Sequence, residues 1–449
     1  MSSSAVSSPV GTAPAEAPTT LTAEVPRTLG FVDQLGLWAN LGISLLIPVT
    51  ASFLVPAGQS FLASVTAILV GSALGCLLLA LVARAGAQTG APSMVLLRGL
   101  FGRRGSYLPT VLNLAQCVGW ATYEIWVISV AAHAVYGSVP RWVYVLAAGV
   151  VATTMALRPL GSVRLLKRVA VVAVLACTAY FFYSALHRPL GSLTGGSWTG
   201  FWTSADLVIA MPVSWIPLVA DYSRFSRTGR AAFSGTYLGY FASSAAFFVL
   251  GVLALRAYAV GPGDDVIGAL LAVPAGAVAL CILAVDEVDE SFANIYSTAT
   301  SAQNVLPRAD RRVLAVIVGA VATTFALVLD GNSYEPFLLL IGAVFVPLAA
   351  TFLVDYHLFG RGGWDTGENA RRRWAMGLPW LAGFVAYQVT VPTQLERFPA
   401  WGTFWTDLQS ALGVSPTNGF SASLVSFAVA GVLAVGCGAA ERAWRPRRA

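Results

Sequence analysis

Four acidic residues lie within five positions of a very apolar chain: Asp286, Glu287, Asp289 and Glu290. They directly follow an apolar run, residues 268–285. Of the 449 residues, only 11% are charged and 57% are hydrophobic. A carboxylate in hydrocarbon costs about 3 kcal/mol or more, so acids inside a membrane usually face a cavity, bind a cation or relay protons. The acidic cluster is therefore the first candidate for a functional site.

The spacing of the cluster indicates what it could do. On a helix, Asp286, Asp289 and Glu290 share one face, and Glu287 lies at its flank. Carboxylates this close cannot all ionise away from water, because burial and mutual repulsion disfavour the charged forms. We therefore expect at least one to stay protonated near neutral pH and to exchange its proton. The alternative is a sodium ion held by one or two of the carboxylates. A third possibility is an acidic patch that takes no part in binding a cation or relaying protons.

The composition predicts an all-α protein that crosses a membrane many times. The mean hydropathy is +0.72, which is too high for a domain with a solvated surface. About 20 apolar residues are needed to cross the hydrocarbon core. Twelve such stretches are expected near 34–56, 60–83, 108–136, 142–158, 168–186, 203–222, 232–257, 266–297, 312–330, 333–356, 374–392 and 420–440.

The basic residues predict how these spans are oriented. If the N-terminus is cytoplasmic, all but four of the 27 Lys and Arg residues fall in cytoplasmic segments. The exceptions are Arg141, Arg188, Arg256 and Arg397. Since positive residues in short loops stay inside the cell, we expect both termini in the cytoplasm and the chain in the cell membrane. The scattered arginines argue against nucleic-acid binding, which needs a basic patch.

The N-terminal segment and the cysteines provide no further candidate for a functional site. Residues 1–28 are rich in Ser, Ala, Thr and Pro, which predicts a disordered cytoplasmic tail. We expect residues 29–449 to form a single transmembrane domain. The five cysteines fall within predicted spans, where a disulfide or zinc framework is not indicated.

Two predicted spans carry helix-breaking residues. The first contains Gly42 and Pro48, and the sixth contains Pro212 and Pro217. A plain proline kink is one explanation. However, the first and sixth spans occupy corresponding positions if the first ten form two five-helix halves. Paired breaks of this kind indicate a binding site at the membrane midplane of a secondary transporter.

The third predicted span carries a polar stripe. Asn113, Gln116, Trp120, Tyr123 and Glu124 follow helical spacing and fall on one face. A tryptophan beside an amide suits a flat heteroaromatic ring, which gains roughly 0.5 to 1.5 kcal/mol from offset stacking. Hydrogen bonds between helices are the competing explanation.

The chain resembles the nucleobase:cation symporter-1 family over essentially its whole length. The segments that carry this resemblance are QTG at 88–90, LR at 97–98, FGRRGSYLP at 101–109, VGW at 118–120, ADYSRFSR at 220–227 and ANIYS at 293–297. It is most similar to the branch of cytosine permeases and hydroxymethylpyrimidine transporters. The resemblance implies a leucine-transporter-like fold with an inverted repeat, at about 30–187 and 200–357, and two extra helices at about 374–440. It also implies alternating access driven by sodium or protons.

The resemblance implies a substrate site as well. Trp120 matches a tryptophan that stacks on the base, and Gln116 or Cys117 lies at or beside its amide partner. The second stacking position falls on Pro212, and Trp215 is the nearest aromatic residue. Ser214 and Asn294 complete the expected substrate contacts.

The resemblance further implies a cation site. Its ligands would be the carbonyls of Gly42 and Leu45 and the side chains of Asp286, Asp289 and Glu290. Relatives often have hydroxyls where this chain has acids, so the coupling ion, sodium or proton, stays open.

The expected activity is import of a cytosine- or purine-type base. Hydroxymethylpyrimidine, hydantoin or allantoin is the alternative substrate. A membrane receptor or enzyme is the alternative of another class, but catalytic and cofactor motifs are not recognised in the sequence. We expect no cofactor other than the coupling ion, the lipid bilayer as surroundings, and function as a monomer.

Overall fold

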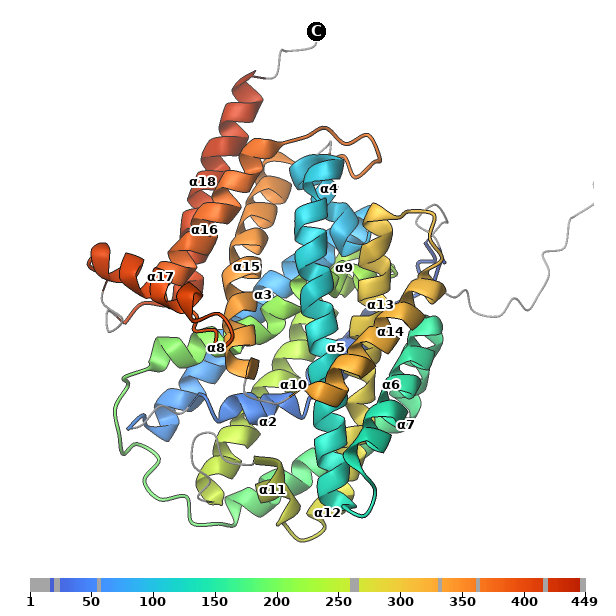
Figure 1. Cartoon of the computed structure of the whole chain (residues 1–449), viewed down its shortest axis with the longest axis vertical. Helices are drawn as coiled ribbons and strands as arrows, with labels where there is room; N and C mark the ends of the chain where they lie inside the picture. The colour runs from blue at the N-terminus through green and yellow to red at the C-terminus, as the bar shows by residue number, and fades with distance from the viewer. Residues whose placement is uncertain are drawn as a thin grey trace, which may run out of the picture.

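The structure is a computed structural model, and it describes residues 17–19, 25–54, 58–258, 266–329, 333–360, 364–414 and 419–444. Most of these residues are helical, and the described part of the chain contains isolated bridges but no strand. The predicted all-α class is confirmed. Figure 1 shows α15, α16 and α18 on one side of the molecule and α6, α7 and α14 on the other.

The α-helices have the following bounds: α1 Phe31–Leu41, α2 Leu46–Ala51, α3 Phe61–Thr89, α4 Ser93–Gly105, α5 Tyr107–Val135, α6 Arg141–Leu157, α7 Pro159–Leu186, α8 Phe201–Ser214, α9 Ile216–Ser223, α10 Gly229–Ala257, α11 Val266–Leu271, α12 Gly276–Asp286, α13 Val288–Val305, α14 Arg311–Val328, α15 Tyr334–Val354, α16 Gly377–Thr390, α17 Pro399–Ala411 and α18 Ala422–Trp444. A π-helical turn, Asp355–Phe359, extends α15.

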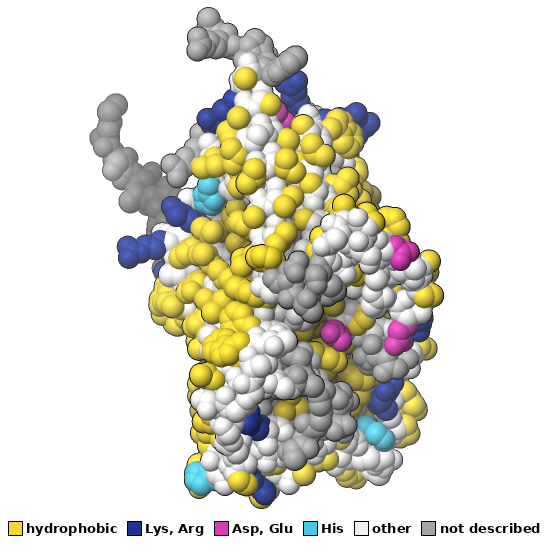
Figure 2. Space-filling view, turned by 90° about the vertical axis from the view of Figure 1, so that its left-hand side faces the viewer, with side chains coloured by type: hydrophobic (Ala, Val, Ile, Leu, Met, Phe, Trp, Pro, Cys, Tyr) yellow, Lys and Arg dark blue, Asp and Glu magenta, His cyan; other side chains and the backbone are white. Residues whose placement is uncertain are grey.

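Six helical segments of the described chain are long and apolar enough to cross a membrane. They are Phe61–Thr89, Phe201–Ser223, Gly229–Ala257, Arg311–Val328, Tyr334–Phe359 and Ala422–Ala443. Arg141–Leu157 and Val172–Leu186 are shorter apolar helices. The outer surface agrees with this character, since Figure 2 shows hydrophobic side chains over much of the upper part of one face.

The α8–α9 segment lies at the centre of the bundle. Within its most apolar window, 94% of the residues are buried. Small residues on α3 allow a close approach: a Cβ on Gly75 would lie 2.3 Å from Cγ of Pro212, and one on Gly71 would lie 2.7 Å from the carbonyl oxygen of Ala205. Membrane helices commonly pack through such small residues. This packing brings α8 close against α3, just before the break between α8 and α9.

Asp206 on α8 holds the start of α18. Its carboxylate accepts hydrogen bonds from the backbone N–H of Ala422 (2.7 Å), the backbone N–H of Ser423 (3.1 Å) and the hydroxyl of Ser421. The first N–H groups of a helix have no partners within the helix. Asp206 therefore acts as a buried N-terminal cap supplied by another helix.

We expect Asp206→Ala to lower the melting temperature of the purified protein in detergent. Loss of a helix cap costs about 1 kcal/mol, and the donors left buried in apolar surroundings add about 1–3 kcal/mol. Asp407→Ala, at an exposed position of α17, is the matched control. Equal melting temperatures for the two variants would show that the cap has no structural role.

Part of the predicted N-terminal tail is described. The carbonyl oxygen of Thr19 accepts hydrogen bonds from the backbone N–H of Arg311 (3.0 Å) and from Nε2 of Gln303 (2.6 Å). Residues 17–19 therefore contact the turn between α13 and α14. Residues 1–16 and 20–24 of the predicted tail lie outside the described residues.

Candidate functional site

Three helix interruptions lie in the interior of the bundle. α1 ends at Leu41 and α2 begins at Leu46, so the chain is unwound around Gly42. α8 and α9 are separated at Trp215, between two prolines. These two breaks confirm the predicted ones. The third, between α12 and α13, was not predicted; it is limited to Glu287, whose backbone angles stay helical (φ −55°, ψ −20°).

Glu287 joins the third interruption to the first. Its Oε1 accepts a hydrogen bond from the hydroxyl of Ser44 (2.8 Å), and its Oε2 accepts one from the backbone N–H of Leu45 (2.6 Å). Two residues further along the chain, Asp289 accepts a hydrogen bond from the side-chain amide of Asn40. The acidic cluster is therefore bonded to both sides of the unwound segment in the first span.

Five carboxylates lie close together without cationic partners. They are Glu124 on α5 and the four acids of the cluster, each at most 3% exposed. Both side-chain oxygens of Asp286 are buried and unbonded, as are Oδ1 of Asp289 and Oε2 of Glu124. The described part of the chain contains no ion pair to any of the five. Since an isolated buried carboxylate is strongly unfavourable, protons or a bound cation must balance this charge.

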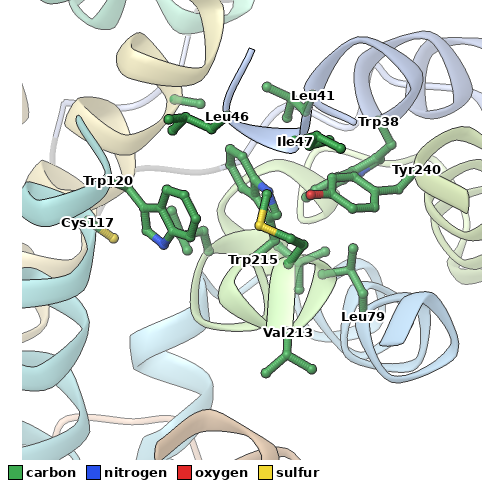
Figure 3. Packing of buried hydrophobic residues seen from close by; sticks show 14 of the residues in the cluster. Trp38, Leu41, Leu46, Ile47, Leu79, Cys117, Trp120, Val213, Trp215 and Tyr240 are labelled. Carbon is green, nitrogen blue, oxygen red and sulfur yellow. The ribbon is translucent and has the colours of Figure 1, made fainter. Parts of the chain in front are cut away.

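A small cavity lies beside the carboxylates. Its lining consists of Trp120, Glu124, Met211, Ser214, Trp215, Glu290 and Asn294. The volume is about 10 Å³, roughly enough for one water molecule. Figure 3 shows Trp120 projecting from α5 toward the region of Trp215, with Trp38 and Tyr240 beyond. The cavity is too small to hold an aromatic ring.

The side-chain amide of Asn294 links Glu124 on α5 to α13. Nδ2 of Asn294 donates to Oε1 of Glu124 (2.7 Å) and to the carbonyl oxygen of Glu290 (3.3 Å). α13 and α5 thus meet at the cavity through polar side chains. Any substrate that enters would face carboxylate oxygens and one amide on this side.

The predicted substrate residues separate into two groups. Trp120, Ser214, Trp215 and Asn294 line the cavity. The other three do not. They are Gln116, which donates to the carbonyl oxygen of Ser214 (2.9 Å); Cys117, which contacts Oδ1 of Asn113 (3.3 Å); and Pro212, which packs against Gly75 of α3.

The predicted cation residues are also spread out. Gly42 packs against α10, since a Cβ there would lie 2.2 Å from Oγ of Ser243. Leu45 presents its N–H to Glu287. Glu290 lines the cavity, whereas Asp286 and Asp289 lie nearer α1. In the described residues, no group of three or more His, Cys, Asp or Glu is arranged to hold a metal ion.

Asn40 and Ser44 were not singled out from the sequence as site residues. Glu124 and Glu287 were named in the polar stripe and the acidic cluster, but neither was assigned to the substrate or cation site. Glu124 had a usable signal, because it lies four residues after Trp120 and therefore on the same helical face. Ser44 lies inside the predicted break. Asn40, and the contact of Glu287 with the first span, become recognisable only when the first and eighth predicted spans are placed side by side.

Comparisons with known proteins agree with this architecture. A family model described as a permease for cytosine/purines, uracil, thiamine and allantoin matches residues 23–373. The cytosine permease of Escherichia coli (strain K12) is 23% identical over 322 residues, which is 70% of this chain and 74% of the relative. A putative purine-cytosine permease of Bacillus subtilis (strain 168) is 24% identical over 356 residues, 74% of this chain and 76% of the relative.

Solved structures show the same fold. A nucleobase-cation-symport-1 family transporter, closed with bromovinylhydantoin bound, has a TM-score of 0.74 at 17% identity and covers 97% of both chains. A Na⁺-coupled sialic acid symporter has a TM-score of 0.64 at 12% identity and covers 92% of this chain and 90% of the other.

Proposed function

The chain belongs to the family of permeases for cytosine/purines, uracil, thiamine and allantoin, and on this premise we propose that it is a secondary active symporter. It imports a nucleobase or a related planar heterocycle, coupled to a cation gradient. The observation that carries this proposal is the buried cavity at the α8–α9 break, lined by two tryptophans, two carboxylates and an amide.

The proposed transport cycle is alternating access. The first ten of twelve spans form two inverted five-helix halves, and the last two spans pack outside them. The interrupted pairs α1–α2 and α8–α9 support this arrangement, because paired breaks supply the midplane sites of such transporters. The protein works as a monomer in the cell membrane with both termini in the cytoplasm.

We favour the proton as the coupling ion. Glu287 bonds directly to the unwound segment, through Ser44 and Leu45. Protonation of such a carboxylate removes its charge and lowers the number of hydrogen bonds that its oxygens can accept. A change in protonation would therefore loosen or tighten the contact between α13 and the break in the first span. Sodium bound by the cluster and by carbonyls at Gly42 and Leu45 is the alternative.

The cavity favours a heterocycle that donates hydrogen bonds. Trp120 and Trp215 supply apolar faces for a flat ring, whereas Glu124 and Glu290 supply acceptors. Amino-substituted rings such as cytosine or an aminopyrimidine offer N–H donors to these oxygens. Imides such as uracil and hydantoin place carbonyl oxygens on both sides of an N–H, and those oxygens repel carboxylate oxygens wherever no acid proton lies between them.

We expect cytosine to inhibit the uptake of labelled cytosine at least tenfold better than uracil or hydantoin does. In Glu124→Gln this preference should shrink to roughly threefold, since hydrogen bonds to charged groups contribute about 1.5–3 kcal/mol and neutral ones about 1 kcal/mol. The measurement is a competition panel in proteoliposomes. Glu335→Gln, a carboxylate at the start of α15 outside the site, is the matched control. A preference that survives intact in Glu124→Gln contradicts the assignment.

A further inference from the structure

A second, much larger hollow lies between α5, α15 and α16. Its volume is about 910 Å³, and its walls include Leu108, Ala115, Phe337, Val344 and Leu381. Leu108 and Leu381 are each 60% exposed, so this hollow is an open groove on the outside of the bundle. In a membrane, such an apolar groove is filled by hydrocarbon.

Arginines gather at one end of this groove. The backbone N–H of Arg103 donates to the carbonyl oxygen of Ala370 (3.3 Å), and that of Arg373 donates to the carbonyl oxygen of Phe101 (3.2 Å). The end of α4 therefore runs beside residues 370–373. This contact brings together Arg103, Arg104, Arg371, Arg372 and Arg373, of which Arg104 and Arg373 line the groove.

Acidic residues balance only part of this positive charge. Arg373 forms a bidentate ion pair with Asp355 (2.6 and 2.8 Å) and a further contact with Glu441 (2.8 Å). Arg103 lies 4.0 Å from Glu368. For Arg104, Arg371 and Arg372, all exposed, the described residues provide no ion pair. The mouth of the groove thus carries excess positive charge next to an apolar wall.

We propose that this groove is a binding site for an anionic phospholipid. An acyl chain lies along α5 and α15, and the phosphate binds Arg104 and the neighbouring Arg372, whereas Arg371 lines a separate hollow. Basic pockets between membrane helices select anionic headgroups. Trp374, 68% exposed at the same end, has the amphipathic ring that prefers the level of the headgroups.

The groove and the substrate cavity share structural neighbours. Gln116 lines the groove and donates to the carbonyl oxygen of Ser214 at the second helix break (2.9 Å). Phe337 also lines the groove, and its ring centroid lies 5.3 Å from that of Trp120. A lipid in the groove therefore packs against residues that hold the cavity wall in place.

Native mass spectrometry of the delipidated protein, titrated with phosphatidylglycerol or phosphatidylcholine, tests the proposal. We expect phosphatidylglycerol to bind more tightly. The double substitution Arg104→Ala and Arg372→Ala should weaken it about fivefold per arginine, as expected for about 1 kcal/mol per basic residue. Arg312→Ala, an exposed arginine of α14, should have no effect.

A second pair of variants tests the apolar wall. Ala115→Trp fills the groove and should reduce binding of both lipids, whereas Val150→Trp, at an exposed position of α6, a helix that does not line the groove, should not. Equal affinity for the two lipids, or a double arginine variant that behaves like Arg312→Ala, would overturn the proposal. So would a dimer that Ala115→Trp dissociates, because a second copy would then cover the groove. These measurements involve no transport, so their outcome is independent of the proposed function.

Discussion

Replacing Glu287 with glutamine is expected to reduce the accumulation of substrate more than tenfold, while exchange of substrate across the membrane continues. Glutamine keeps the shape of the side chain and can still accept from the N–H of Leu45, but it cannot bind or release a proton. The contact with the unwound segment of the first span would then remain, but it would no longer respond to the binding and release of a proton. The measurement compares uphill uptake with counterflow of labelled substrate in proteoliposomes.

Glu335→Gln makes the same chemical change outside the cluster and should leave both activities intact. Thermal melting of both variants checks that the fold survives. If Glu287→Gln still accumulates substrate like the wild type, Glu287 has no role in coupling.

Trp120→Ala is expected to raise the dissociation constant of the substrate at least tenfold. Trp120 is only 4% exposed and forms a wall of the cavity. Its ring is held edge-on by Tyr334 and Phe337, at centroid distances of 6.0 and 5.3 Å. Loss of stacking removes about 0.5–1.5 kcal/mol beyond the lost apolar burial, and 1.4 kcal/mol corresponds to a tenfold change.

Binding of labelled cytosine to the purified protein measures this effect. Trp120→Phe retains an aromatic face and should recover part of the affinity. Trp198→Ala removes a tryptophan that is 55% exposed in the loop before α8 and serves as the control. Equal affinities for Trp120→Ala and Trp198→Ala would place the substrate elsewhere.

The interrupted helices were predictable because the residues that cause them act locally. Gly42, Pro48, Pro212 and Pro217 weaken helical hydrogen bonding wherever they occur, and their positions in corresponding spans made the pair informative. The third break lacks this signal, since Glu287 is flanked by Asp286 and Val288. It was therefore treated as part of a continuous helix.

The backbone stays helical through Glu287 (φ −55°, ψ −20°), so the faces of the acidic cluster follow helical periodicity, but the contacts of those faces were not predicted. A continuous helix places Glu287 at the flank of the stripe formed by Asp286, Asp289 and Glu290. In the structure, Glu287 is the residue that contacts the unwound segment, through Ser44 and Leu45. Contacts between residues about 240 positions apart depend on tertiary packing, which periodicity in the sequence does not encode.

The substrate site was only partly predicted, again because some of its contacts depend on tertiary packing. Trp120 was found from its residue type and its place on the polar stripe, and Trp215 as the aromatic residue nearest the second stacking position that the resemblance implies. Pro212 was an expectation from the resemblance, whereas in the structure it packs on Gly75. Which side of α8 faces the cavity follows from the close approach of α3, and that approach depends on glycines in a distant span.

Uptake of labelled cytosine into proteoliposomes under imposed ion gradients tests the central claim most directly. We predict that an inward proton gradient drives uptake above equilibrium, that a protonophore abolishes it, and that a sodium gradient alone has little effect. Accumulation that follows the sodium gradient and ignores the protonophore would contradict proton coupling. Uptake that ignores both gradients would contradict symport itself.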